Sequence, residues 1–347
     1  MDKLQVGVIG VGQMGARHAQ VLAHMPQVEL VALADRRLDR CQAVAKQLGV
    51  PTAVSDYREL LDLPEVHAVS ICTPDELHRD PVLAACAAGK HILLEKPLAT
   101  DLAEARELVA AVNRTGVKAM VAHLLRFDPR YAQVKAAADR GDLGDLIYIV
   151  SHRNSPHTEG PRLYKPGTSL TMHVAVHDLD LIDWLMPGDP VWVSAQAAEK
   201  LLRDRRMHDA VSAVLAFENG AIASVNYSWC LPEQPPTRLD ARMEIVGTSG
   251  AAYVGSYPGQ GVLLATQCSV DTPDLQHGPV VSGSIRGDLR EEIFAFVDCV
   301  LKDRESPVPV EEALRSVAMG HAILQSLAQR RPVELSMPKP GGDGGNS

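Results

Sequence analysis

The stretch Gly10-Val11-Gly12-Gln13-Met14-Gly15 constrains the fold of this 347-residue chain more than any other. It follows an apolar run at 4–9 and precedes a segment, 14–24, with the pattern of a helix. Between a strand and a helix, the first glycine permits a tight turn, the second lets the backbone approach a pyrophosphate, and the third allows close helix–strand packing. The helix N-terminus adds donors for the phosphates. The stretch therefore predicts a dinucleotide site, with these cofactor-binding residues: Gly10, Gly12, Gln13, Met14 and Gly15.

An acidic residue follows the next apolar run at the spacing that such a site requires. Asp35 stands twenty positions after Gly15, at the end of the run 28–34. A carboxylate there can accept hydrogen bonds from both ribose hydroxyls of NAD and repels a 2′-phosphate. The alternative is a simple turn residue. Arg36 and Arg37 follow directly, so tolerance of NADP stays open. We expect NAD as cofactor, with Asp35 and Arg36 among its ligands.

The first third of the chain alternates strand and helix patterns. Compact apolar strands are expected at 4–9, 28–34, 68–72, 91–94 and 118–123, with a short strand near 53. Asp101-x-x-Glu104 has the pattern of a capping box and predicts the start of a helix. Alternating elements with continuous apolar strands indicate a parallel sheet covered on both faces. The chain is therefore predicted to be α/β, with a doubly wound Rossmann domain at 1–122.

The pattern changes after residue 123. Helices are expected at 128–140, 170–185, 289–302 and 310–329, and strands at 146–153, 191–198, 209–217, 221–229, 238–246 and 251–254. Asn219-Gly220 between two of these strands is a strong hairpin signal. We expect a second α/β domain at 123–336, built on a mostly antiparallel sheet. The Gly- and Pro-rich segment 337–347 is expected to be a disordered tail.

Composition excludes several classes of partner. The net charge is −9 and no run of Lys or Arg occurs, which argues against nucleic acid or an anionic membrane as the main partner. No apolar run reaches the roughly 18–20 residues of a membrane span, and no secretory leader pattern precedes the first strand. The six cysteines are scattered, without a Cys-x-x-Cys pair. These features predict a cytoplasmic protein with reduced thiols.

Two polar clusters are candidates for chemistry. Lys96, in Glu95-Lys96-Pro97, follows the strand 91–94, where a fixed cation can stabilise alkoxide charge; taken alone, this tripeptide is also a common surface turn. His173 and His177 lie one turn apart on the predicted helix 170–185, on the edge shared with Asp180 and Trp184. Either histidine can instead be a hydrogen-bonded core residue. A metal site lacks an obvious third ligand, and none is predicted.

Other polar residues beyond the domain junction are candidates for the substrate. The stretch 153–165 is either a substrate loop or a solvated connection, and it contains Arg153, Asn154, His157, Arg162 and Lys165. Arg126 and Tyr131 lie just past the junction and can line the same crevice. The predicted substrate-binding residues are Lys96, Arg126, Asn154, His157, His173 and His177.

The motifs together resemble the Gfo/Idh/MocA family, named after glucose–fructose oxidoreductase, inositol dehydrogenase and the rhizopine-catabolism oxidoreductases. The resemblance covers most of the chain and is most specific in its middle part, which runs Cys72-Thr73-Pro74, His78, Gly89-Lys90-His91 and Glu95-Lys96-Pro97-Leu98. It implies that Thr73, Pro74, His78, Glu95 and Lys96 belong to the cofactor site. It also implies that Lys96 is the active-site lysine and His177 the general acid/base.

The resemblance further implies the oxidation or reduction of a secondary alcohol on a sugar or polyol, such as an inositol. It also implies that the second domain has a large open sheet, binds the substrate and mediates oligomerisation, in homodimers or homotetramers that often pack face to face. One departure concerns the substrate: where the family usually has Asp four residues before the catalytic histidine, this chain has His173, which we expect to orient a neighbouring hydroxyl. The alternatives are a nucleotide-sugar or uronate dehydrogenase that uses the cations near 126–165, a non-catalytic NAD- or sugar-binding sensor, and a metal-dependent hydrolase.

Overall fold

The computed structural model describes residues 3–160, 169–205, 207–233, 239–255, 264–265, 270–271 and 277–338. The described chain forms two compact units. Unit 1 contains the described residues up to 127 and residues 277–314, and unit 2 contains the described residues of 128–271 and residues 315–338. The second segment of unit 1 lies inside the range 123–336 that the sequence assigns to one domain. The last residues of the predicted tail, 339–347, lie outside the described part.

Unit 1 is built on a six-stranded, fully parallel sheet with the strand order β3-β2-β1-β4-β5-β6. Its strands are β1 (Leu4–Ile9), β2 (Val28–Ala34), β3 (Thr52–Val54), β4 (Ala68–Ile71), β5 (His91–Glu95) and β6 (Ala119–Ala122). Most of their residues are buried because helices cover both faces, which explains the continuous apolar runs. The order reverses between β1 and β4, and ligands of such sheets bind at this point, beyond the carboxyl ends of the strands. The predicted doubly wound fold is confirmed.

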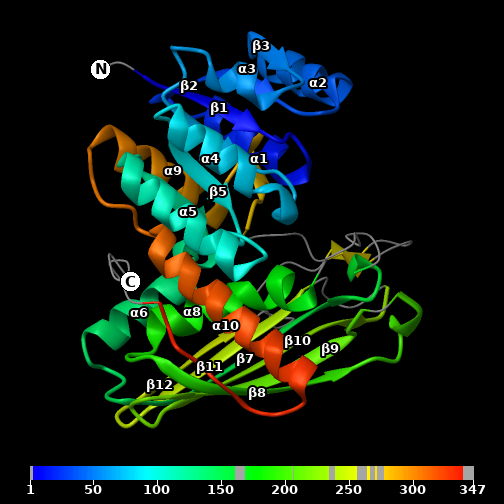
Figure 1. Ribbon diagram of the computed structural model, residues 1–347, viewed down its shortest axis with the longest axis vertical. Coiled ribbons are helices and arrows are strands. Elements are labelled where there is room, and N and C mark those ends of the chain that lie inside the picture. Colours follow the sequence, from blue (N-terminus) through cyan, green and yellow to red (C-terminus); the bar gives the residue numbers. More distant parts are fainter. Residues whose placement is uncertain are drawn as a thin grey trace. The chain divides into compact units, whose positions relative to one another are not determined.

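The helices of this sheet begin and end where local sequence signals place them. They are α1 (Gln13–Ala23), α2 (Leu38–Leu48), α3 (Tyr57–Leu61), α4 (Arg79–Ala87) and α5 (Leu102–Thr115) (Figure 1). The Asp101 carboxylate accepts hydrogen bonds from the backbone N–H groups of Ala103 and Glu104, which caps α5. Gly49 ends α2 with φ +71°, a left-handed conformation that glycine adopts without steric cost.

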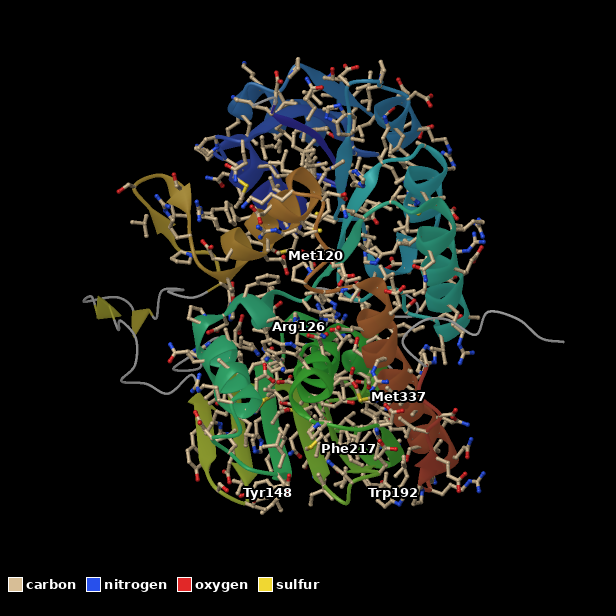
Figure 2. All side chains as sticks on the ribbon, turned by 90° about the vertical axis from the view of Figure 1, so that its left-hand side faces the viewer. Met120, Arg126, Tyr148, Trp192, Phe217 and Met337 are labelled. Carbon is tan, nitrogen blue, oxygen red and sulfur yellow. The ribbon has the colours of Figure 1, made fainter. Side chains whose placement is uncertain are left out.

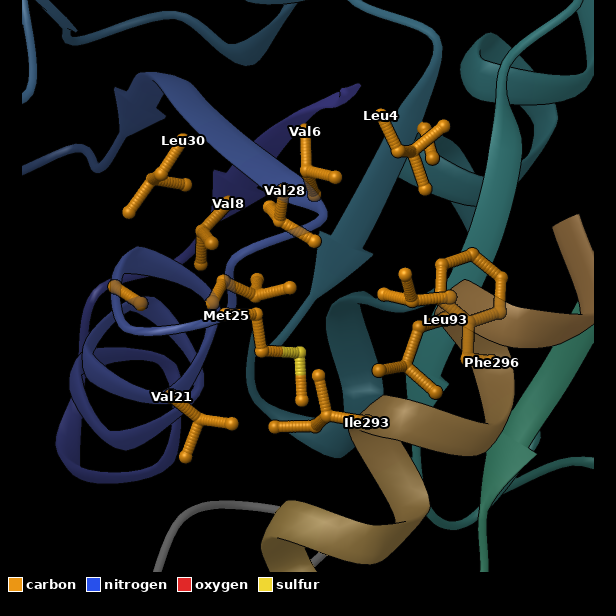
Figure 3. Packing of buried hydrophobic residues seen from close by; sticks show 14 of the residues in the cluster. Leu4, Val6, Val8, Val21, Met25, Val28, Leu30, Leu93, Ile293 and Phe296 are labelled. Atoms are coloured by element: carbon orange, nitrogen blue, oxygen red, sulfur yellow. The ribbon is translucent and has the colours of Figure 1, made fainter. Parts of the chain in front are cut away.

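A helix from the far end of the chain completes the core of unit 1. In α9 (Asp288–Leu301), the side chains of Ile293, Phe296 and Val297 pack in one cluster with residues of β1, β2 and β5 (Figure 3). All three are almost fully buried. The apolar face of α9 therefore belongs to the core of unit 1, although about 165 residues separate it from β6.

Unit 2 contains a seven-stranded sheet with the order β12-β11-β7-β10-β9-β8-β17. Its strands are β7 (Leu146–Pro156), β8 (Pro190–Ala198), β9 (Ala210–Phe217), β10 (Ile222–Leu231), β11 (Asp240–Gly247), β12 (Ala251–Gly255) and β17 (Val333–Glu334). Only β7 and β10 pair in parallel, so the predicted, mostly antiparallel sheet is confirmed. Asn219 and Gly220 turn β9 into β10, where the Asn219 side chain accepts from the N–H of Ala221 and Gly220 has φ +85°.

Helices cover one face of the unit 2 sheet (Figure 1). They are α6 (Pro129–Asp139), the π-helical turn η3 (Thr171–Ala175), α8 (Val176–Leu185) and the part of α10 (Val310–Gln329) that belongs to this unit. Inward-pointing residues are buried, whereas Val214 and Ile222 on the other face are 39% and 49% exposed. Figure 2 labels two further side chains of this outer face, Tyr148 and Trp192.

Short elements complete the described structure. They are the single turns η1 (Asp75–Leu77), η2 (Leu124–Phe127) and η4 (Arg203–Arg205), and two small hairpins, β13 (Leu264–Ala265) with β14 (Val270–Asp271) and β15 (Val280–Val281) with β16 (Ser284–Ile285). Within the described residues, no helix has both the length and the apolar character of a membrane span.

Candidate active site

The glycine turn between β1 and α1 has the geometry of a phosphate cradle. Gly10 has φ +87°, and a Cβ atom there would lie 2.8 Å from the carbonyl oxygen of Cys72. A Cβ atom at Gly15 would lie 1.8 Å from the carbonyl oxygen of Gly10, so only glycine permits this close packing. A Cβ atom at Gly12 would meet no atom within 4 Å, which leaves open space where a pyrophosphate approaches. The turn therefore fits a dinucleotide.

The first turn of α1 can supply donors to that space. Gly12 occupies the N-cap position of α1, and no side chain caps the helix there. Gln13 and Met14 form its first turn, whose backbone N–H groups have no intrahelical acceptor and are suited to bind an anion. The cofactor-binding roles of both residues stay predictions.

Asp35 lies directly after β2, and protein donors surround its carboxylate. Its Oδ2 accepts from the backbone N–H of Val11 at 2.9 Å, and its Oδ1 accepts from that of Arg37 at 2.8 Å. The Nη2 atom of Arg40 lies 2.8 Å from Oδ1 and 2.7 Å from Oδ2. This contact of Arg40 has no signal in the sequence, because it depends on the rotamer of a long side chain on α2. Arg36 is exposed beside Asp35.

The turns after β4 and β5 are joined by His78. One ring nitrogen, Nδ1, lies 2.8 Å from the carbonyl oxygen of Pro97, and Nε2 lies 3.1 Å from that of Thr73. The ring is buried, so it links the turn containing Thr73 and Pro74 to the Glu95-Lys96-Pro97 turn. Because β1, β4 and β5 are parallel neighbours, both turns lie at the same edge of the sheet as the glycine turn.

Glu95 points into the interior, where it forms a buried network. Its Oε1 lies 3.0 Å from Nε2 of His18 on α1, and Nδ1 of His18 lies 2.8 Å from the hydroxyl of Ser70. Burial alone would lower the pKa of His18, but the neighbouring Cys72 and Glu95 raise it well above its usual value. Burial would raise the pKa of Glu95, but its hydrogen bond with His18 lowers it. His18 was not predicted as a functional residue, because its only signal in the sequence is a polar residue on the inward face of α1.

Arg126 is also held within unit 1. Its side chain is 4% exposed and forms an ion pair with Glu312 of α10 (Arg126 is labelled in Figure 2). Arg126 lies in η2, directly after β6 and His123. The guanidinium charge predicted for substrate binding is thus already balanced by a carboxylate.

In unit 2, the two candidate histidines lie at the junction of η3 and α8. His173 lies within the π-helical turn and His177 in the first turn of the regular helix. Such π turns inside helices are rare and occur frequently at functional sites. The prediction of one continuous α-helix over 170–185 missed this turn, so the uniform spacing used to align the histidines does not apply to His173.

Aromatic and hydroxyl side chains pack around the turn. The rings of His173 and Trp229 have centroids 6.3 Å apart at an angle of 51°. The Thr171 and Tyr227 hydroxyls lie 2.9 Å apart, which ties the turn to β10. Both Trp229 and Tyr227 are buried. The sheet therefore fixes the π turn, and with it the backbone of His173.

A buried ion pair ties the start of α8 to β7. The Arg153 guanidinium donates to Asp178 through Nε at 2.6 Å and Nη2 at 3.2 Å, and both side chains are buried. Burial raises the pKa of the neighbouring Tyr131 to about 12. Asp178 follows His177 directly, so this pair positions the backbone that carries His177. It also means that the Arg153 charge is balanced by protein.

The remaining substrate candidates have other partners. Successive strand residues point to opposite faces, so Asn154 lies on the face opposite to Arg153, where it bonds to Ser228 at 2.7 Å and Asp240 at 3.2 Å. Nδ1 of His157 lies 3.0 Å from the carbonyl oxygen of Leu231. Arg162 and Lys165 lie outside the described residues. No group of three or more His, Cys, Asp or Glu residues in the described part could hold a metal ion.

Comparisons with known proteins agree with this geometry. The model of the "Oxidoreductase family, NAD-binding Rossmann fold" matches residues 4–123, and that of the "GFO/IDH/MocA C-terminal domain" matches residues 131–253. The chain is 30% identical over 346 residues to inositol 2-dehydrogenase 2 of Saccharopolyspora erythraea, with 97% of each chain covered. It is 28% identical over 346 residues to the scyllo-inositol 2-dehydrogenase (NAD(+)) of Bacillus subtilis, covering 97% of this chain and 98% of the relative.

A solved structure with the same fold is that of a putative myo-inositol dehydrogenase from Sinorhizobium meliloti. It has a TM-score of 0.81 and 25% sequence identity, and the match covers 96% of this chain and 100% of the other. With a relative 30% identical over nearly its whole length, and with a glycine cradle of the right shape, the chain is an oxidoreductase of the Gfo/Idh/MocA family whose first unit is an NAD-binding Rossmann domain.

Proposed function

We propose that this protein is an NAD-dependent dehydrogenase acting on a secondary alcohol of a cyclic polyol or sugar, with an inositol as the leading substrate class. The observation that carries the proposal is the position of Lys96, directly after β5 and at the same sheet edge as the glycine cradle. A cation there can stabilise negative charge that develops on an alcohol oxygen. The names of the relatives, which are inositol dehydrogenases, support the substrate class.

The proposed mechanism divides the work between two side chains. His177 accepts the proton of the substrate hydroxyl as general base. Lys96 orients that hydroxyl and stabilises its oxygen as it becomes an alkoxide. NAD, when bound, would supply the acceptor for the hydride that leaves the substrate carbon. His173 donates to or accepts from a neighbouring hydroxyl, and the Arg153–Asp178 pair keeps the His177 backbone in place.

The test is to substitute the two side chains separately and to measure chemistry and cofactor binding in parallel. We expect His177→Gln to lower turnover by about 10²–10⁴-fold, the usual contribution of a positioned general base. We expect Lys96→Met to lower it by about 10²–10³-fold, as for the loss of an oxyanion donor. The Kd of NAD⁺ should change little for His177→Gln. Turnover is followed by nicotinamide absorbance with a panel of inositols and sugars.

The control is Lys302→Met, because Lys302 is an exposed lysine at the end of α9 that pairs with Asp298. Near-wild-type turnover in either active-site variant would overturn the assigned roles. If NAD⁺ binds but no alcohol of the panel is oxidised, the result favours the alternative of a non-catalytic NAD- or sugar-binding sensor. The alternative of a nucleotide-sugar or uronate dehydrogenase is less favoured. It requires free cations for an anionic substrate, but Glu312 and Asp178 already balance the charges of Arg126 and Arg153.

We also propose that the protein forms homodimers or homotetramers through the outer face of the unit 2 sheet. Apolar side chains are exposed on this face: Trp192, Val214, Ile222 and Tyr253. Exposed apolar side chains that gather on one face of a molecule mark interaction surfaces. A cytoplasmic location is proposed because the cysteines of the described part, Cys41, Cys72, Cys86, Cys230 and Cys299, are free thiols.

A further inference from the structure

The carboxylate that is expected to bind the adenosine ribose already has its full complement of protein donors. A carboxylate has about four acceptor directions. In Asp35 each oxygen accepts one backbone N–H, from Val11 or Arg37, and shares Nη2 of Arg40. The Asp35 side chain is 5% exposed, so it cannot turn outward to meet a ligand. A ribose whose 2′ and 3′ hydroxyls donate to these oxygens must therefore displace Arg40.

Arg40 is able to leave, and its guanidinium retains unused hydrogen-bonding capacity. Its side chain is 39% exposed, in contrast to that of Asp35. Its Nε atom is buried and has no hydrogen-bond partner among the described residues. A guanidinium that uses Nε together with an Nη atom presents two parallel donors, the arrangement that suits a phosphate group. A phosphate on the 2′ oxygen would also need a cation there to offset the negative charge of Asp35.

We propose that Arg40 is a cofactor-selecting residue: it competes with the ribose hydroxyls of NAD for Asp35, and it pairs with the 2′-phosphate of NADP. The protein therefore binds both cofactors. Arg40 weakens the binding of NAD and strengthens the binding of NADP, so the difference between the two affinities becomes smaller. The proposal concerns the adenosine end of the cofactor and is independent of the substrate.

The test measures cofactor binding without turnover. Dissociation constants of NAD⁺, NADP⁺, 5′-AMP and adenosine 2′,5′-bisphosphate are determined by calorimetry for the wild-type protein and for Arg40→Gln. Because glutamine cannot form the charge-assisted pair, we expect NADP⁺ and the bisphosphate to bind about 10- to 100-fold more weakly, the range for a hydrogen bond to a charged group. NAD⁺ and 5′-AMP should bind more tightly than to wild type, because their competitor for Asp35 is gone.

Two further variants make the result decisive. Arg140→Gln removes an exposed arginine of unit 2 that pairs with Asp142, so it alters the net charge equally and should leave all four constants unchanged. Arg40→Lys keeps the charge without the two-donor fork, and should bind NADP⁺ with intermediate affinity. Equal changes for NAD⁺ and NADP⁺ in Arg40→Gln would overturn the proposal. So would weaker NAD⁺ binding with unchanged NADP⁺ binding, or a wild-type protein that binds no NADP⁺.

Discussion

A single buried histidine fixes the end of the strand that carries the proposed active-site lysine. His18 of α1 holds Glu95, the last residue of β5, while Lys96 follows directly. Both members of the pair are buried, so each needs the charge of the other. The helix of the glycine turn and the strand end at Lys96 are thus connected through one pair of side chains.

The His18–Glu95 pair should give the protein a distinctive dependence of stability on pH. The raised pKa of His18 means that its contribution is complete below the usual value of 6.5 and is lost as pH rises through the raised value. The lowered pKa of Glu95 means that its contribution is complete above the usual value of 4.5 and is lost as pH falls through the lowered value. The pair therefore contributes most between these two usual values.

We expect His18→Gln to lower the free energy of unfolding by about 3–5 kcal/mol within that window, because a buried carboxylate loses its charged partner. The loss should shrink as pH rises through the raised pKa of His18. Urea unfolding of both proteins over a pH series measures this difference. A difference that stays constant with pH would show that His18 acts only through packing.

At the level of elements, the glycine turn contains one glycine that folding requires and another that cofactor binding requires. Gly15 faces backbone and Gly12 faces open space, although they lie three residues apart in the same motif. The added Cβ of Gly15→Ala collides with the Gly10 carbonyl, so we expect the variant to lose about 1–3 kcal/mol of stability, together with NAD⁺ affinity.

Gly12→Ala is the matched comparison. Its unfolding free energy should change by about 1 kcal/mol or less, the scale of an N-cap effect, because its methyl group meets no protein atom. Its NAD⁺ affinity should fall at least about 10-fold, because the methyl group occupies the approach of the pyrophosphate. Thermal unfolding and NAD⁺ titration of both variants test this. Equal losses of stability would contradict the geometry.

The elements also show what the sequence could and could not predict. The strands β1 to β6 and the turn at Gly10 were predictable, because burial on both faces and a tight turn leave local signatures. The Asp101 cap and the Asn219-Gly220 turn are local for the same reason. The π turn at His173 is not predictable this way, because contacts with β10 stabilise it rather than its own residues.

The site was predicted only in part, for a related reason. Residue types and spacing indicated the glycines and Asp35, and the family resemblance indicated Lys96, but neither indicated the partners of these residues. The contacts of Glu95 with His18 and of Asp178 with Arg153 join residues 77 and 25 positions apart. Such pairs depend on how the elements pack against one another, and this packing cannot be predicted from a single sequence.

At the scale of the whole molecule, the proposed association between copies uses the outer face of the unit 2 sheet. We expect the double variant Val214→Lys, Ile222→Lys to lower the mass of the assembly, because two buried ammonium groups oppose the association of like faces. Sedimentation velocity measures the mass. The control is Val281→Lys, at an exposed apolar residue of the small hairpin in unit 1. An unchanged mass in the double variant would exclude this face as the interface.

The return of α9 to unit 1 has a consequence for how the chain is made. The residues of the parallel sheet are synthesised first. Ile293, Phe296 and Val297 leave the ribosome only after nearly all of unit 2 has been synthesised. Until then, the nascent NAD-binding unit exposes the apolar surface that α9 later covers. The core of the NAD-binding unit is therefore complete only late in synthesis, and a fragment ending at residue 127 would lack the α9 side chains of that core.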